Sequence, residues 1–126
     1  MEYLEKQFKY KGYRAFILAM PIGHRCGYVE LPKNHKYFRL DYDAIDVDCH
    51  GGLTYSDSHL QDIKDSWFIG FDCIHLGDGK DINIMDDKNK DFCKQYPKLE
   101  YHSLGGEIIW TTEMVEEELK QLIEQL

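Results

Sequence analysis

The 126-residue sequence predicts a single α+β domain, in which a mostly antiparallel β-sheet carries a C-terminal amphipathic α-helix. Two observations support the sheet: strand-type segments flank a short glycine turn near the amino end, and later segments alternate with a period of two. A third supports the helix, because apolar residues near the carboxyl end recur with helical spacing. We expect the sheet core over about residues 7–76, a polar loop region over 77–110 and the helix over 112–126.

The first strands are expected at residues 7–10 and 13–20, which flank the polar turn Lys11-Gly12. The second of these strands is apolar on both faces, which is typical of a strand in the middle of a sheet. A third strand is expected at 26–31. The amino-terminal part therefore predicts a hairpin followed by one more strand.

Two further strands are expected in the middle of the chain. Residues 44–50 alternate, with one face formed by Ile45, Val47 and Cys49 and the other by Asp46, Asp48 and His50. Residues 51–65 have the composition of a loop. The strongest strand pattern covers 66–76, with one face formed by Trp67, Ile69, Phe71, Cys73 and His75. The other face is largely apolar too, so this strand is expected in the middle of the sheet.

The carboxyl-terminal half is expected to contain a long polar loop and then a helix. Residues 77–100 are polar and charged, with one helical turn around 91–95. Thr111 or Thr112 can cap the final helix, and Glu113 suits the positive end of its dipole. Its apolar stripe consists of Val115, Leu119, Leu122, Ile123 and Leu126. This stripe is expected to face the core, and would form a dimerisation face if it were exposed.

The charge balance argues against a nucleic-acid-binding protein. The formal net charge is −8, from 23 acidic and 15 basic residues, and nucleic-acid affinity depends mainly on neutralising phosphates. An acidic protein could instead block a basic protein partner. The four cysteines lack a C-x-x-C spacing, the amino end lacks a signal-peptide core, and no apolar run is long enough to span a bilayer. We therefore expect a soluble protein with reduced thiols, in the cytoplasm.

Cysteine and histidine side chains form the first candidate site. Cys73 and His75 are two positions apart on a predicted strand, so both project from one face, as two zinc ligands could. Cys26 with either His50 or Cys49 could complete the set. The alternative is that Cys73 is a small core residue and that His75 is a hydrogen-bonded residue at the strand end.

Carboxylates form the second candidate site. Asp46 and Asp48 share a predicted face with His50, and Asp72, Asp78 and Asp81 could approach from the neighbouring strand. Grouped carboxylates suit Mg²⁺ or Mn²⁺ and phosphoester chemistry. The alternative is a solvated strand face, which is the norm for antiparallel sheets. Asp72 fits that alternative least well, because a carboxylate inside an apolar strand needs a partner if it is buried.

A glycine turn at residues 50–56 forms the third candidate site. Adjacent glycines permit positive φ, so peptide N–H groups can approach an anion. We expect a ligand-binding pocket, for a phosphorylated or nucleotide-like molecule, built from two segments. The first supplies His50, Gly51, Gly52, Thr54, Tyr55 and Ser56, and the second supplies Trp67, Asp72 and Asp78. The alternative is that the glycines serve only to turn the chain.

These segments resemble a group of small uncharacterised proteins of bacteriophages, prophages and other mobile elements. The resemblance rests on the motifs GHRCGYV at 23–29, HGGLTYS at 50–56 and WFIGFDCIHLGD at 67–78, and it continues into the C-terminal helix. This chain departs from the family pattern chiefly at Ile69 and Leu76. The resemblance implies a phage-type accessory protein, and such proteins often counter host defence.

Three functions follow from the sequence. The first is a phage-type accessory protein that binds a small phosphorylated or nucleotide-like ligand in a bacterial cytoplasm. The second is a metal-dependent hydrolase with Zn, Mg or Mn, whose catalytic candidates are His50, Asp72, His75 and Asp78. The third is an acidic inhibitor of a host defence protein. The sequence leaves open whether the protein is an enzyme and whether it forms homo-oligomers.

Overall fold

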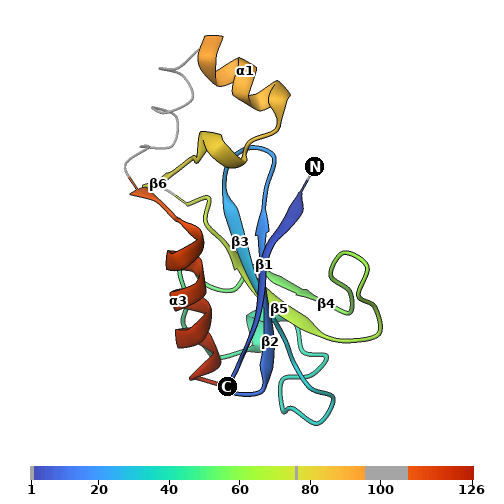
Figure 1. The fold of residues 1–126 in the computed structure, drawn as a ribbon. Coiled ribbons are helices and arrows are strands. Elements are labelled where there is room, and N and C mark those ends of the chain that lie inside the picture. Colours follow the sequence, from blue (N-terminus) through green and yellow to red (C-terminus); the bar gives the residue numbers. More distant parts are fainter. Residues whose placement is uncertain (1, 76, 96–107) are drawn as a thin grey trace.

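A five-stranded antiparallel sheet forms the centre of the fold, in the strand order β1-β2-β3-β5-β4 (Figure 1). This computed structural model describes residues 2–75, 77–95 and 108–126. The strands of the sheet are β1 (Tyr3–Tyr10), β2 (Tyr13–Ala19), β3 (Arg25–Glu30), β4 (Tyr55–Asp57) and β5 (Phe68–Asp72). With the C-terminal helix, this sheet confirms the predicted α+β class.

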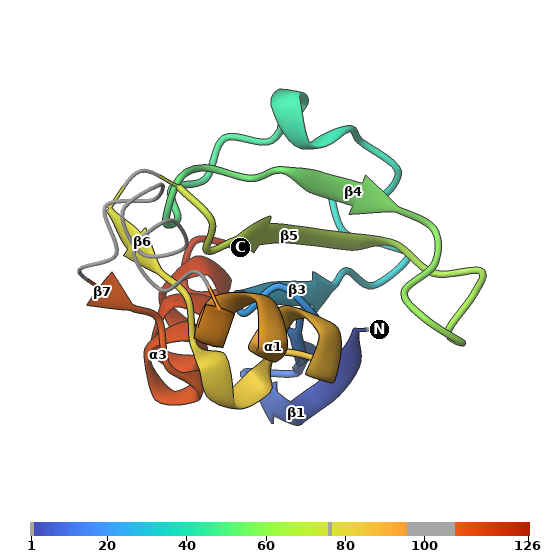
Figure 2. The same ribbon diagram turned by 90° about the horizontal axis from the view of Figure 1, so that it is seen from above.

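The other elements surround this sheet. A short parallel pair is formed by β6 (Asp78–Gly79) and β7 (Ile108–Ile109), and the helices are α1 (Asp87–Gln95) and α3 (Thr112–Ile123). Two 3₁₀ turns cover Tyr42–Ala44 and Ile82–Ile84. Helix α1 lies beyond one end of the sheet, whereas α3 runs along one face (Figures 1 and 2).

The predicted amino-terminal hairpin is confirmed, and its first strand is longer than expected. Tyr10 pairs with Tyr13 beside the turn, and Tyr3 pairs with Ala19 at the far end. The register shifts between Leu4 and Lys6, which makes Glu5 the extra residue of a β-bulge. A bulge redirects a side chain, and the Glu5 carboxylate binds Arg25 of β3 with Oε1 2.7 Å from Nε.

One face of the sheet forms the larger hydrophobic core, together with α3. Its buried members include five residues of β2, β3 and β5 and four residues of the helix. They are Ala15, Ile17, Val29, Ile69, Phe71, Val115, Leu119, Leu122 and Ile123. The predicted apolar stripe of the helix therefore faces the sheet. Because a buried leucine of this kind stabilises a fold by about 2–5 kcal/mol relative to alanine, this layer holds the helix in place.

The opposite face carries a smaller core beneath the loop between β4 and β5. Its buried members are Phe16, Leu18, Cys26, Tyr28, Leu60 and Phe68. The rings of Phe16 and Phe68 meet edge to face with centroids 5.9 Å apart. The loop and α3 extend on opposite sides of the sheet in both ribbon views. Strands β2, β3 and β5 are thus buried on both faces, as the composition of the segments at 13–20 and 66–76 predicted for β2 and β5.

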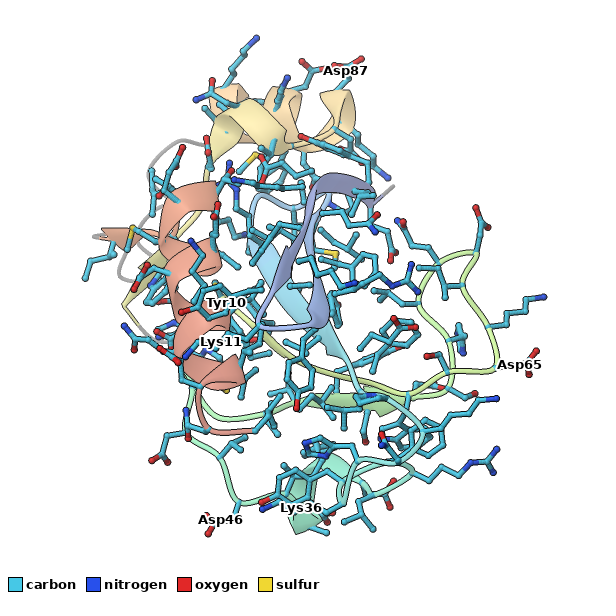
Figure 3. The ribbon with its side chains drawn as sticks, turned by 60° about the horizontal axis from the view of Figure 1, so that its bottom comes forward. Tyr10, Lys11, Lys36, Asp46, Asp65 and Asp87 are labelled. Carbon is cyan, nitrogen blue, oxygen red and sulfur yellow. The ribbon has the colours of Figure 1, made fainter. Side chains whose placement is uncertain are left out.

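Helix α3 begins as its sequence predicts, and polar contacts that the sequence did not predict anchor its C-terminal end. The Thr111 hydroxyl accepts a hydrogen bond from the Met114 N–H at 3.3 Å, so Thr111 is the N-cap. Lys11, in the β1–β2 turn, forms an ion pair with Glu124, and Tyr10 and Lys11 lie beside the C-terminal part of the helix (Figure 3). The helix is therefore tied to the hairpin by polar contacts as well as by the core.

Three predicted segments are wrong in detail. Residues 44–50 form no strand, although their exposure alternates: Ile45 is buried and Asp46 projects into solvent (Figure 3). The segment is held by the residues that follow α3 instead of by a strand, since the side-chain amide of Gln125 exchanges two 2.7 Å hydrogen bonds with the backbone of Asp48. The expected loop at 51–65 contains β4, and the expected turn around 91–95 is the end of the longer helix α1.

Candidate functional site

The polar residues of the candidate site meet at the carboxyl end of β5. Asp72 is the last residue of this strand, and His75 and Asp78 follow it within one short connection to β6. The fourth contributor, His50, comes from the glycine turn that precedes β4. Asp78 is 4% exposed, so its carboxylate is an ionisable group inside the protein. Such a group requires compensating contacts.

Two histidines surround the Asp78 carboxylate. His50 Nε2 lies 2.8 Å from Oδ2 and 3.0 Å from Oδ1, so Nε2 carries the proton in this pair. The backbone N–H of His75 donates to Oδ2 at 2.9 Å, and the Asp78 N–H donates to the His75 carbonyl at the same distance. The two imidazole rings are nearly perpendicular, with centroids 5.4 Å apart. The carboxylate is thus held in one orientation.

The His75 imidazole has one nitrogen that the fold leaves unsatisfied. Nε2 lies 3.4 Å from Asp72 Oδ1, whereas Nδ1 is buried and makes no hydrogen bond to the described residues. Nδ1 lies 3.5 Å from Asp78 Oδ2, which is too long for a hydrogen bond. If Nε2 carries the proton towards Asp72, the lone pair of Nδ1 faces a carboxylate with no positive charge between them.

The three residues have the composition and spacing of a metal centre. One ligand atom from each of His50, His75 and Asp78 lies within 4.8 Å of the others, and these residues form the metal-type cluster of the described chain. Ligands of a single zinc ion lie about 2.0–2.2 Å from it, and are therefore about 3–3.5 Å apart from one another. Only small side-chain movements would bring the three ligand atoms to one ion.

Asp72 and His24 extend the cluster beyond His75. Thr54 Oγ1 donates to Asp72 Oδ2 at 3.2 Å, which leaves the other oxygen facing His75. His24 has a buried Nδ1 without a hydrogen bond to the described residues. Burial lowers the pKa of His24; the Asp72 carboxylate opposes this shift, and Lys80 adds to it. The imidazole and carboxylate groups of these residues are therefore neighbours at the end of the sheet where β5 finishes.

The position of His50 is set by α3 and the segment before it. The His50 ring stacks on the indole of Trp110, with centroids 4.0 Å apart and an interplanar angle of 29°. Its backbone N–H donates to Glu118 Oε2 at 2.7 Å. The Trp110 carbonyl accepts from Arg25 Nη1 at 3.0 Å, and Arg25 is buried. The core on the helix face therefore fixes both the ring and the backbone of His50.

The glycine turn makes room for His75. Gly51 and Gly52 have φ of 70° and 82°, a region that glycine adopts at no steric cost. A Cβ on Gly51 would overlap the His75 imidazole, while a Cβ on Gly52 would meet nothing within 4 Å. The Gly52 N–H donates to the Cys49 carbonyl at 2.9 Å. The Gly52 N–H is therefore hydrogen-bonded within the turn, and the side of Gly51 that lacks a side chain faces the His75 ring.

Not all of the predicted ligand-binding residues share this location. His50, Gly51, Thr54, Asp72 and Asp78 come together, with His75 between them.

Tyr55, Ser56 and Trp67 lie elsewhere. The Tyr55 ring packs edge to face on Tyr28, and its hydroxyl donates to the His59 carbonyl. The Ser56 hydroxyl accepts a hydrogen bond from the Tyr42 N–H. Trp67 precedes β5 and lies at its other end, where its indole N–H donates to the Leu40 carbonyl at 3.0 Å.

The structure does not bring the predicted zinc-binding cysteines together at one site. Cys26 belongs to the smaller core and Cys73 to the larger one, on opposite faces of the sheet. Burial raises the pKa of Cys26 and of Cys49 to about 12, and it raises the pKa of Cys73 as well. Thiolates are therefore disfavoured at all three positions, and the core explanation of Cys73 applies. Cys93, whose side chain is outside the described residues, is not placed.

The carboxylate cluster expected on 44–50 is also not assembled. Asp46 and Asp48 are exposed and lie on a segment that is not a strand. Asp81 pairs with Arg25 at 3.1 Å rather than with the histidines. Sequence reasoning missed two contributors, Trp110 and His24, because nothing in the local pattern separates them from a surface residue. Their roles depend on contacts between segments far apart in the chain.

No family model, curated protein or solved structure matches this chain. The resemblance to phage and prophage proteins therefore stays a prediction. Within the described residues, every helix is too short or too polar to cross a membrane.

Proposed function

We propose that this protein is a metal-dependent hydrolase of small phosphorylated molecules, with His50, His75 and Asp78 as the metal ligands. The observation that carries the proposal is the buried Nδ1 of His75, which makes no hydrogen bond within the described part of the chain and lies 3.5 Å from the Asp78 carboxylate. A cation between these atoms would satisfy both. It would also accept His50, whose Nε2 already lies 2.8 Å from the same carboxylate.

The ligand set indicates the class of metal. Two imidazoles and one carboxylate suit Zn²⁺, Mn²⁺ or Fe²⁺, whereas Mg²⁺ prefers oxygen ligands alone. Three protein ligands leave positions for water and substrate, as in catalytic rather than structural centres. Such an ion lowers the pKa of bound water towards neutrality and polarises a phosphoryl oxygen.

Asp72 is a positioning residue in this proposal. A histidine that binds a metal through one nitrogen commonly donates its other N–H to a carboxylate, which fixes the tautomer and the ring. Asp72 Oδ1 is the carboxylate oxygen beside that nitrogen, 3.4 Å from His75 Nε2, so a small movement would bring it to hydrogen-bond distance, and Thr54 holds the second oxygen. Asp72 would thus keep the Nδ1 lone pair of His75 available to the ion.

Metal binding is the first test. Purified protein is stripped with chelator and titrated calorimetrically with Zn²⁺ and Mn²⁺. We expect one equivalent to bind, with the His50 hydrogen moving from Nε2 to Nδ1, because Nε2 must offer its lone pair to the ion. His75→Gln should lose at least about 100-fold in affinity, and Asp72→Asn about 10–100-fold, the range for an orienting carboxylate.

His59→Gln is the matched control. His59 also pairs with an aspartate, with Nδ1 3.1 Å from Asp57 Oδ1, but this pair is exposed and lies in the loop after β4. Equal metal affinity in the His75 and His59 variants would overturn the proposed centre.

Hydrolysis is the second test. The metal-loaded protein is assayed with bis(p-nitrophenyl) phosphate and with a panel of nucleotides, and activity should disappear in His75→Gln and persist in His59→Gln. One equivalent of metal without turnover of any phosphate ester would contradict the hydrolase. The centre would then serve ligand binding, which is the first of the three functions that follow from the sequence. The phage-type, anti-defence role and an inhibitory action on a host protein rest on sequence alone.

A further inference from the structure

A second group of polar side chains lies at the opposite end of the sheet from the histidine–aspartate cluster. The register of β3 and β5 pairs Cys26 with Asp72 at one end and Glu30 with Phe68 at the other. Around Glu30, a hollow of about 340 Å³ is lined by Lys9, Gly12, Arg14, Glu30, Leu31, Pro32, Lys33 and Ser66. Neither of the two proposed metal-binding histidines lines it.

This hollow continues into a second one with a different lining. The second hollow measures about 460 Å³ and is lined by Lys33, Phe38, Arg39, Ser58, Asp65, Ser66 and Trp67. Lys33 and Ser66 belong to both walls, so the two hollows are neighbours. We call the two together the basic groove.

The first half of the groove concentrates positive charge on an acidic protein. Three cations line it, Lys9, Arg14 and Lys33, against the single carboxylate of Glu30. Lys9 and Arg14 are direct partners across β1 and β2, so their side chains share a face. Like charges directly opposite one another destabilise a sheet. Glu30 compensates the charge of Arg14, so Lys9 and Lys33 supply the excess of positive charge in this hollow, in a chain of net charge −8.

Glu30 holds Arg14 in a fixed orientation. Arg14 Nε lies 2.6 Å from Oε1 and Nη2 lies 2.9 Å from Oε2, and the Ser66 hydroxyl donates to Oε2 at 2.6 Å. The Arg14 guanidinium also lies 5.6 Å from the ring of Phe16. A guanidinium held in this way is prepared for an anion, because little freedom remains to be lost on binding.

The second half of the groove offers aromatic surface. Trp67 and Phe38 line it, and the indole N–H of Trp67 is fixed by the Leu40 carbonyl at 3.0 Å. The Arg39 guanidinium lies 5.8 Å from the Phe38 ring. Arg39 and Asp65, both on this wall, have positive φ of 69° and 57°, and a non-glycine residue adopts this conformation at a cost of about 1–2 kcal/mol.

We propose that the basic groove binds a nucleotide. The phosphates would contact Lys33, Arg14 and Lys9, and the base would lie against Trp67 and Phe38. A nucleotide combines a polyanion with a flat ring, which are the two chemistries that adjoin here. Because the groove lies at the other end of the sheet, this proposal does not depend on the metal centre.

The test uses the full-length protein in chelator, so that the proposed metal centre takes no part. ADP is titrated by calorimetry, with adenosine and inorganic pyrophosphate as separate probes for the two halves. We expect ADP to bind more tightly than either. In a ¹⁵N spectrum the indole signal of Trp67 should shift and that of Trp110 should not, with Trp110→Phe providing the assignment.

Two exposed lysines give a matched pair of variants. Lys33 lines both hollows, whereas Lys64, in the nearby loop, lines neither. Lys33→Gln should weaken ADP binding at least about fivefold, which corresponds to about 1 kcal/mol, and Lys64→Gln should leave it unchanged. The two changes alter net charge equally, so long-range electrostatics cannot separate them.

Three results would overturn the groove as a nucleotide site. They are the absence of ADP binding, equal weakening in both lysine variants, and loss of ADP binding in His75→Gln with no change in Lys33→Gln. The last result would move the ligand to the histidine cluster. Failure of metal binding, by contrast, would leave the groove unaffected.

Discussion

The backbone of Gly51 packs directly against the imidazole ring of His75. A Cβ at this position would come closer than 3.0 Å to three atoms of the ring, a distance that real Cβ atoms essentially never show. The neighbouring Gly52 has a similar backbone conformation and open space beside it. One glycine of the pair therefore shapes the site, and the other only turns the chain.

This difference gives a prediction with an internal control. Gly51→Ala and Gly52→Ala carry similar backbone strain, since both residues have positive φ, but only the first displaces His75. We expect Gly52→Ala to lose about 1 kcal/mol of stability, and Gly51→Ala to lose more because its Cβ must also displace the His75 ring. Only Gly51→Ala should lose metal affinity, by at least about tenfold, measured by calorimetry. Equal affinity in the two variants would contradict the arrangement of His75 described above.

Arg25 should be the most costly charged residue to remove. It is 6% exposed and binds Glu5 from the bulge of β1, Asp81 and the Trp110 carbonyl. Arg25→Leu would leave two carboxylates without their cation, a change that costs about 3–5 kcal/mol when a buried pair is broken. Urea unfolding measures this loss. We expect Arg14→Leu, whose pair with Glu30 is more exposed, to cost less.

His24 should make the stability of the protein fall in mild acid. Burial lowers its pKa in the folded state below the ordinary value of 6.5, so the unfolded chain binds the proton more tightly. The contribution of His24 to the free energy of unfolding is therefore complete above pH 6.5. It declines as the pH falls from 6.5 towards the folded-state pKa of His24. Asp72 opposes the shift and Lys80 adds to it, but burial is the largest cause.

The measurement compares wild type with His24→Gln in chelator, by urea unfolding at about pH 7.5 and about pH 5. The other histidines are common to both proteins, so the difference between the two curves isolates His24. We expect the wild type to lose more stability than the variant between these values. Parallel losses would show that His24 is not held in its neutral form.

The described cysteines should resist alkylation in the native state. Burial raises the pKa of Cys26 and of Cys49 to about 12, so almost no thiolate is present at neutral pH. Iodoacetamide labelling followed by peptide mass spectrometry should modify Cys26 and Cys73 only after denaturant is added. Rapid native labelling of either would contradict their place in the two cores.

The elements that the sequence predicted correctly are those with strong local periodicity. The hairpin, the central strands and the C-terminal helix each show an apolar pattern that one face or two faces of the fold then bury. Residues 44–50 misled this reasoning, because their alternation arises from packing along α3 and not from a strand partner. The short strand β4 carries no such pattern, since its three residues are all half-buried.

For the candidate site, the sequence determined which residues are candidates, and the tertiary structure decided which of them meet. His50, Asp72, His75 and Asp78 stand out by residue type and by their place beside glycines and a strand end. That His50 reaches Asp78, while Tyr55 and Trp67 do not, depends on strand register and on the docking of α3. Register and docking are set by long-range burial, which no local pattern contains. The Nδ1 of His75, which has no hydrogen-bond partner among the described residues, is likewise a property of the tertiary structure, because its burial depends on the packing around it.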